Sequence, residues 1–83
     1  MTMTINNINE FRTADLALTA VICVFGFVIK SIEKINIQRS VFIFENSEEL
    51  LEVVNKYWRQ ELRIEPQQYF NQLKILKARI YER

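Results

Sequence analysis

The sequence predicts a single small α+β domain over residues 11–83, with the element order α-β-β-α-α. Two neighbouring segments, residues 27–35 and 39–44, are rich in β-branched and aromatic residues, which is typical of strands. The segments on either side of them place apolar residues at helical spacing. The chain has 83 residues, of which 49% are hydrophobic and 25% charged, and this composition indicates one globular unit.

The N-terminal part of the chain divides into a polar segment and an apolar helix. Residues 1–10 are polar and show no periodicity, so we expect a mobile lead-in. A first helix is predicted over residues 14–25, with Thr13 as its N-cap and Asp15 in its first turn. This helix is apolar nearly all round, which indicates burial on most sides. Gly26 follows it and can adopt the left-handed conformation that closes a helix.

The two strand segments are predicted to form a β-hairpin. Its turn falls within residues 34–38, where Asn36 is the residue best able to adopt a positive φ angle. The run from Val41 to Phe44 is entirely apolar, so both faces of the second strand should be covered. Two strands alone are marginally stable, so helices must cover the hairpin, and its edge could pair with a second copy of the chain. Val41 and Ile43 are therefore candidate interface residues.

Two helices are predicted after the hairpin. The first begins at Asn46 as N-cap, with Glu49 three residues later as in a capping box. Pro66 is well placed in the first turn of the second. The hairpin should pack against the buried first helix and this C-terminal helix pair. The apolar face of the last helix is expected to contain Tyr69, Phe70, Leu73, Leu76 and Ile80.

The residue types needed for most catalytic and metal-binding sites are scarce. The chain has no histidine, and its one cysteine, Cys23, lies in an apolar run. Catalytic and metal sites draw on histidines, clustered cysteines or converging carboxylates. A single glycine also excludes a glycine-rich phosphate loop. We therefore expect a protein that is not an enzyme and has no metal, cofactor or small-molecule substrate.

The same features bear on localisation. A lone cysteine excludes an internal disulfide and favours a reducing cytoplasm, and apolar neighbours predict an inert buried thiol. The uncharged run from Leu16 to Ile29 is shorter than the roughly 20 residues of a membrane-spanning helix. The segment before it is net negative, unlike a signal peptide. We expect a soluble cytoplasmic protein that does not bind membranes.

Basic residues concentrated near the C-terminus form the main candidate binding surface. The whole chain has a net charge of +1, whereas residues 66–83 carry four cations and one carboxylate. Basic and amide side chains along a helix suit phosphate contacts and base-edge hydrogen bonds. The alternative is a solvated face whose cations complement the helix dipole. The candidate residues are Arg59, Arg63, Lys74, Lys77, Arg79 and Arg83.

A second candidate surface contains the neighbouring aromatic residues Tyr57 and Trp58. Neighbours on a helix point about 100° apart, so one ring can enter the core while the other lies at its boundary. Both residue types are also common anchors of protein interfaces. The pair is therefore either core or a contact surface for a partner.

Short motifs lie along nearly the whole chain after residue 10: Arg12-Thr13-Ala14-Asp15-Leu16, Gly26-Phe27, Phe42-Ile43-Phe44-Glu45, Tyr57-Trp58, Leu62-Arg63, Pro66, Tyr69-Phe70, Leu73-Lys74 and Lys77-Ala78-Arg79-Ile80-Tyr81. Together they resemble the motifs of a small family of uncharacterised proteins from bacteria and their phages. The resemblance implies no activity and no site residues, but it implies the context of mobile elements, whose small proteins often bind nucleic acid or another protein. The Asn36-Ile37 turn departs from the expected pattern because it lacks a glycine.

The sequence thus leads to two hypotheses of function. The first is a non-catalytic accessory protein of a phage or mobile element that contacts nucleic acid, or a nucleic-acid-processing complex, through the basic C-terminal helix. The alternative is a protein–protein interaction module or a homo-oligomer, such as a homodimer, that uses the hairpin edge or the Tyr57-Trp58 surface.

Overall fold

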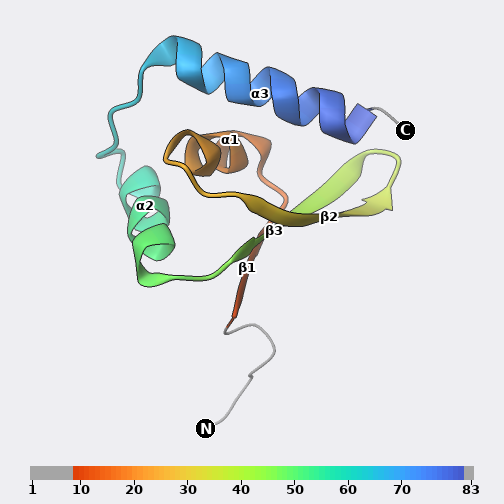
Figure 1. Cartoon of the computed structure of the whole chain (residues 1–83), viewed down its shortest axis with the longest axis horizontal. Coiled ribbons are helices and arrows are strands. Elements are labelled where there is room, and N and C mark those ends of the chain that lie inside the picture. Colours follow the sequence, from red (N-terminus) through yellow and green to blue (C-terminus); the bar gives the residue numbers. More distant parts are fainter. Residues whose placement is uncertain (1–8, 82–83) are drawn as a thin grey trace, which may run out of the picture.

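The computed structural model describes residues 9–81, which form a three-stranded antiparallel sheet and three helices (Figure 1). The α+β class is confirmed, as is the order of helix, hairpin and two further helices. Most of the predicted lead-in, residues 1–8, lies outside the described part of the chain. In order, the elements are β1 (Glu10–Thr13), α1 (Leu16–Val24), β2 (Ile29–Asn36), β3 (Arg39–Glu45), α2 (Glu48–Trp58) and α3 (Pro66–Tyr81).

The short strand β1 is an element that the sequence analysis does not predict. It pairs antiparallel with β3, from Glu10 opposite Glu45 to Thr13 opposite Phe42, and the strand order is β1-β3-β2. β3 is therefore the central strand, with a neighbouring strand paired on each side. β1 occupies the β3 edge of the hairpin, so the expected pairing of the hairpin edge with a second copy is wrong for β3 and stays a prediction for β2.

The N-caps of α1 and α2 each lie later in the chain than predicted. Asp15, rather than Thr13, caps α1, and its Oδ1 accepts a hydrogen bond of 3.1 Å from a first-turn N–H. Thr13 belongs to β1 and is paired with β3. Ser47, rather than Asn46, caps α2, and its Oγ accepts a hydrogen bond of 3.1 Å from the backbone N–H of Leu50. The backbone N–H of Asn46 donates to the carbonyl of Asn9, which prolongs the β1–β3 pairing. Caps of this kind stabilise a protein by about 1 kcal/mol each.

Both α1 and α2 end in a Schellman motif, with a left-handed residue after the C-cap. After α1, Gly26 has φ +96°, its N–H donates to the carbonyl of Cys23, and the N–H of Phe27 donates to that of Ile22. This confirms the role expected for Gly26. After α2 the equivalent residue is Gln60, with φ +61°. The left-handed conformation lowers the stability by about 1–2 kcal/mol for a glutamine, whereas a glycine adopts it without this cost.

The hydrophobic core joins the sheet to α1, while α3 covers the opposite side of α1 and α2 packs beside it (Figure 1). Five consecutive residues, Leu18–Ile22, are buried, which confirms that α1 is enclosed on most sides. Within residues 9–81 we find no helix with the length and hydropathy to span a bilayer. The buried cluster consists of Leu18, Ala20, Ile22, Phe42, Phe44, Leu50, Val54 and Leu76.

Charged side chains cover the outer face of the sheet, which points away from α1. Arg12 on β1 binds Glu33 on β2 at 2.6 Å, so this ion pair crosses the central strand. Lys30 on β2 binds Glu10 on β1 at 3.1 Å, and Glu10 also lies 3.6 Å from Arg12. Exposed pairs of this kind contribute little stability individually, about 0–1 kcal/mol. Their arrangement, however, places a polar layer over the middle of the sheet.

The proposed interface residues Val41 and Ile43 lie beneath this layer. Ile43 pairs with Arg12 and Val41 with Glu33, and paired residues project from the same face of a sheet. Ile43 is accordingly only 2% exposed and Val41 is half-buried. The expectation that both faces of β3 are covered is confirmed. The prediction of Ile43 as an interface residue is wrong, because its side chain is enclosed by the protein's own residues.

The hairpin turn is closed by a side chain rather than by a positive φ angle at Asn36. Oδ1 of Asn36 accepts a hydrogen bond of 2.8 Å from the backbone N–H of Gln38, an arrangement that asparagine forms readily in turns. In the described chain, positive φ angles occur at Gly26 and Gln60 and not at Asn36. The predicted backbone role of Asn36 is therefore wrong. The asparagine amide supplies the closure for which other hairpins use a glycine.

Candidate functional site

The strongest local concentration of positive charge lies on α3 and the hairpin tip. α3 contains Lys74, Lys77 and Arg79 and no carboxylate, and the tip, residues 34–40, adds Lys34 and Arg39 and again no carboxylate. These two elements therefore hold five cations and no acid in a chain of net charge +1. The carboxylates of the protein are carried by its other segments.

The residues around Pro66 determine where α3 begins, and its apolar residues determine how it packs. Pro66 is its first residue, as predicted, and Oε1 of Glu65 accepts a hydrogen bond of 2.9 Å from the backbone N–H of Gln68. The helix then lies along α1 and leaves its lysines on the side that faces solvent. Its contacts with the core are made by the buried Leu76 and the half-buried Tyr69, Leu73 and Ile80.

The predicted apolar face of α3 is correct except at one position. Phe70 is predicted on that face, but it is 57% exposed, because six residues of helix place it about 120° from Leu76. Its ring packs edge-on against that of Tyr69 at a centroid distance of 5.7 Å, which supports it at the surface. Tyr81, near the C-terminal end, is 73% exposed. Two aromatic rings therefore face solvent from the same helix.

These rings lie in line with two lysines along the helix surface, which we call the α3 stripe. It consists of Phe70, Lys74, Lys77 and Tyr81, at the spacing i, i+4, i+7 and i+11 that keeps side chains on one face. Both lysines are exposed, and neither forms an ion pair with any carboxylate of residues 9–81. The helical spacing of these four residues is the signal that the sequence analysis misses.

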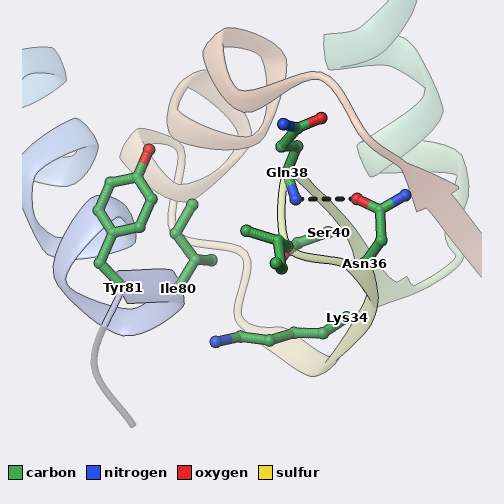
Figure 2. A pocket seen from close by; sticks show the side chains of 7 residues that line it. Lys34, Asn36, Gln38, Ser40, Ile80 and Tyr81 are labelled. Carbon is green, nitrogen blue, oxygen red and sulfur yellow. Dashed lines mark hydrogen bonds between the residues drawn. The ribbon is translucent and has the colours of Figure 1, made fainter.

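A groove separates the hairpin tip from the C-terminal end of α3, and we call it the tip groove (Figure 2). Figure 1 shows these two parts lying side by side, at the opposite end of the molecule from α2. The groove is open to solvent, with a volume of about 740 Å³. Its lining residues are Lys34, Asn36, Ile37, Gln38, Ser40, Ile80 and Tyr81. A smaller pocket of about 250 Å³ shares part of this lining and also contacts Ala14 and Arg39.

The six basic residues that the sequence analysis groups together do not form one surface. Lys74 and Lys77 belong to the α3 stripe, but Arg79 lies on another side of α3 and lines a pocket with Cys23. Arg59 is the C-cap residue of α2 and forms an ion pair with Glu61 at 3.2 Å. Arg63 is exposed in the connector before α3. Arg83 lies outside the described residues.

The structure separates the roles of Tyr57 and Trp58. Tyr57 is half-buried and packs against the core, whereas Trp58, the last residue of α2, is largely exposed. Their rings meet edge-to-face at a centroid distance of 5.0 Å. One ring therefore lies against the core and the other at the surface, as the angle between helical neighbours led us to expect.

A third surface is apolar and lies where α1, β2 and α3 meet. Val28 and Ile75 are exposed there and border a pocket of about 270 Å³, and Phe25 is exposed nearby in the chain. The pocket also contains Cys23, which is half-buried and not fully buried as predicted. Burial raises the pKa of the Cys23 thiol above its ordinary value, and the positive charge of Arg79 lowers it by a smaller amount.

We expect the raised pKa of Cys23 to be visible in the pH dependence of alkylation by iodoacetamide. Only the thiolate reacts, so the rate for the folded protein should reach its midpoint at a higher pH than for the urea-unfolded chain. Arg79→Gln should move this midpoint higher still, since it removes the charge that favours the thiolate. Arg63→Gln, the control, should not move it.

The sign of the associated stability change follows from the same pKa shift of Cys23. Because folding favours the neutral thiol, its contribution to stability is complete below the pKa of the unfolded thiol and is lost as the pH rises through that of the folded one. A folded midpoint at or below the unfolded one would contradict the burial of this side chain.

No group of three or more acidic or cysteine side chains suited to a metal ion occurs among residues 9–81.

A family model described as "Domain of unknown function (DUF5659)" matches residues 8–82, nearly the whole chain. No curated protein and no solved structure matches the chain.

Proposed function

We propose that this chain is a non-catalytic protein that binds nucleic acid through α3 and the hairpin tip. The chain belongs to the DUF5659 family of domains of unknown function. The observation that carries the proposal is that these two elements hold five cations and no carboxylate, four of which, Lys34, Arg39, Lys74 and Lys77, belong to the hairpin tip or the α3 stripe. Uncompensated cations on adjacent elements of a nearly neutral protein favour a polyanionic partner.

The geometry favours a partner that extends along the molecule. Lys74 and Lys77 are one helical turn apart on the α3 stripe, and Lys34 and Arg39 lie across the tip groove from the end of α3. Successive phosphates of a nucleic acid could contact these side chains in turn. Phosphate contacts supply most of the affinity of sequence-independent binding, and they bring no base specificity by themselves.

The cellular setting belongs to the same proposal. The resemblance to proteins of bacteria and their phages supports a role as an accessory protein of a mobile element. In that role the protein would contact either nucleic acid itself or a nucleic-acid-processing complex. The lone cysteine, Cys23, supports a reducing cytoplasm.

A salt titration tests the proposed function directly. Fluorescence anisotropy of a labelled oligonucleotide of about 20 nucleotides should show binding at about 50 mM salt. With three to four phosphate contacts, the affinity should fall about 20- to 50-fold between about 50 and 200 mM salt. Absence of binding at the lower salt concentration, or an affinity that salt does not change, would defeat the proposal.

A second candidate function, self-association, is favoured by the apolar surface around Val28 and Ile75. These two exposed aliphatic side chains border one pocket, and β2 next to them is an edge strand of the sheet. Trp58, on α2, could serve a separate partner. Light scattering separates the candidates, because a monomeric mass at high micromolar concentration removes self-association without affecting nucleic-acid binding.

A further inference from the structure

We propose that the tip groove receives an unpaired nucleobase, so that the preferred partner is single-stranded nucleic acid. The inference rests on the proposed function and adds the substrate class to it. It is carried by the composition of the groove, which combines an aromatic ring, aliphatic side chains, amides and a cation in one open space.

The walls of the groove suit the flat faces of a base. Tyr81 and Ile80 form the wall on the α3 side (Figure 2). Ile37 belongs to the lining on the hairpin side, and 99% of its surface is exposed. Neither the ring of Tyr81 nor the side chain of Ile37 belongs to the core. Exposed aromatic rings provide stacking platforms for single-stranded nucleic acids, and stacking does not depend on the identity of the base.

The polar groups of the groove suit the edges and the backbone of a nucleotide. Gln38 contributes an amide that can donate to and accept from a base edge, and the turn around it is held by the hydrogen bond from its N–H to Asn36. Lys34 extends from the hairpin towards α3 at the margin of the groove (Figure 2). Its ammonium group is placed to contact a phosphate beside the stacked base.

The α3 stripe continues the same pattern beyond the groove. From Tyr81 it leads through Lys77 and Lys74 to Phe70, whose ring is also exposed. A line of rings and cations matches a strand whose bases and phosphates both remain accessible. In a duplex the bases are stacked and paired inside, so the rings would find no partner and only the cations would contribute.

The experiment compares an oligonucleotide of about 20 nucleotides with its duplex, by anisotropy at about 50 mM salt. We expect the single strand to bind about tenfold more tightly or better. Tyr81→Leu should weaken single-strand binding about 5- to 50-fold, leave duplex binding unchanged and keep the salt dependence, because a ring and no charge is lost. Excess nucleoside monophosphate should not displace the strand, since it lacks the contacts along α3.

Two control variants make the result specific. Tyr81→Phe keeps the ring and should retain single-strand affinity, and Trp58→Leu removes an exposed ring distant from the groove and should have no effect. Equal affinity for strand and duplex, or an unchanged affinity of Tyr81→Leu with salt-dependent binding intact, would overturn the inference alone. Absence of binding to either nucleic acid would defeat the proposed function as well.

Discussion

Replacing Phe44 by alanine is expected to lower the free energy of unfolding by about 3–5 kcal/mol, the range for a fully buried phenylalanine. Phe44 is completely buried on the central strand, between Phe11 on β1 and Ile29 on β2. A domain of this size has a total stability of about 4–12 kcal/mol. The variant should therefore melt about 15–30 °C lower, measured by far-UV circular dichroism.

The hairpin offers a matched control for this experiment. Ile37→Ala also removes a large apolar side chain, but Ile37 is almost fully exposed at the tip. We expect it to change the stability by less than about 0.5 kcal/mol. Similar melting temperatures for Phe44→Ala and Ile37→Ala would contradict the packing described for the sheet against α1. The result would not depend on whether either proposal about function is right.

The sequence is sufficient to predict the elements whose local signals agree with their environment. The apolar character of α1 on all sides, the apolar run in β3 and the proline that begins α3 each correspond to the structure. In these segments, local propensity and burial favour the same conformation. Agreement between levels of this kind is what makes a segment predictable from its residues alone.

The strand β1 and the two N-caps could not be derived in this way, because tertiary pairing determines them. Four residues, Glu10–Thr13, carry a weak strand signal and are held by β3. Once Thr13 is paired in the sheet, Asp15 is left to cap α1, so one missed strand displaces a predicted cap. Gln60 shows the same limit, since nothing about a glutamine indicates a left-handed conformation.

The candidate site is predicted in part, through the cations of the last helix. Lys74 and Lys77 lie together on its surface, whereas Arg59 and Arg63 lie near the far end of α2 and in the connector that follows it. The contribution of the hairpin tip is not predicted, because the proximity of Lys34 to the end of α3 arises only from the tertiary fold. Charge counted along a chain does not reveal which cations share a surface.

Reversing both lysines of the α3 stripe should have the largest effect on nucleic-acid binding. Lys74→Glu with Lys77→Glu removes two charge-assisted contacts, each contributing about 1.5 kcal/mol, so affinity should fall roughly 100-fold at low salt. The slope of log affinity against log salt should also decrease, by about 1.4 for a single strand, because two fewer counterions are released. Both side chains are exposed and form no ion pair among the described residues, so the circular dichroism spectrum should be unchanged.

The decisive control reverses the same number of charges at the other end of the molecule. Arg59→Glu with Arg63→Glu changes the net charge by the same four units, from +1 to −3, but leaves α3 and the hairpin tip intact. If the α3 stripe binds the phosphates, this variant should lose no more than a few-fold in affinity, through long-range repulsion alone. Equal losses in the two double variants would mean that overall charge governs binding. The α3 stripe would then have no special role, and the proposed interface would have to be abandoned.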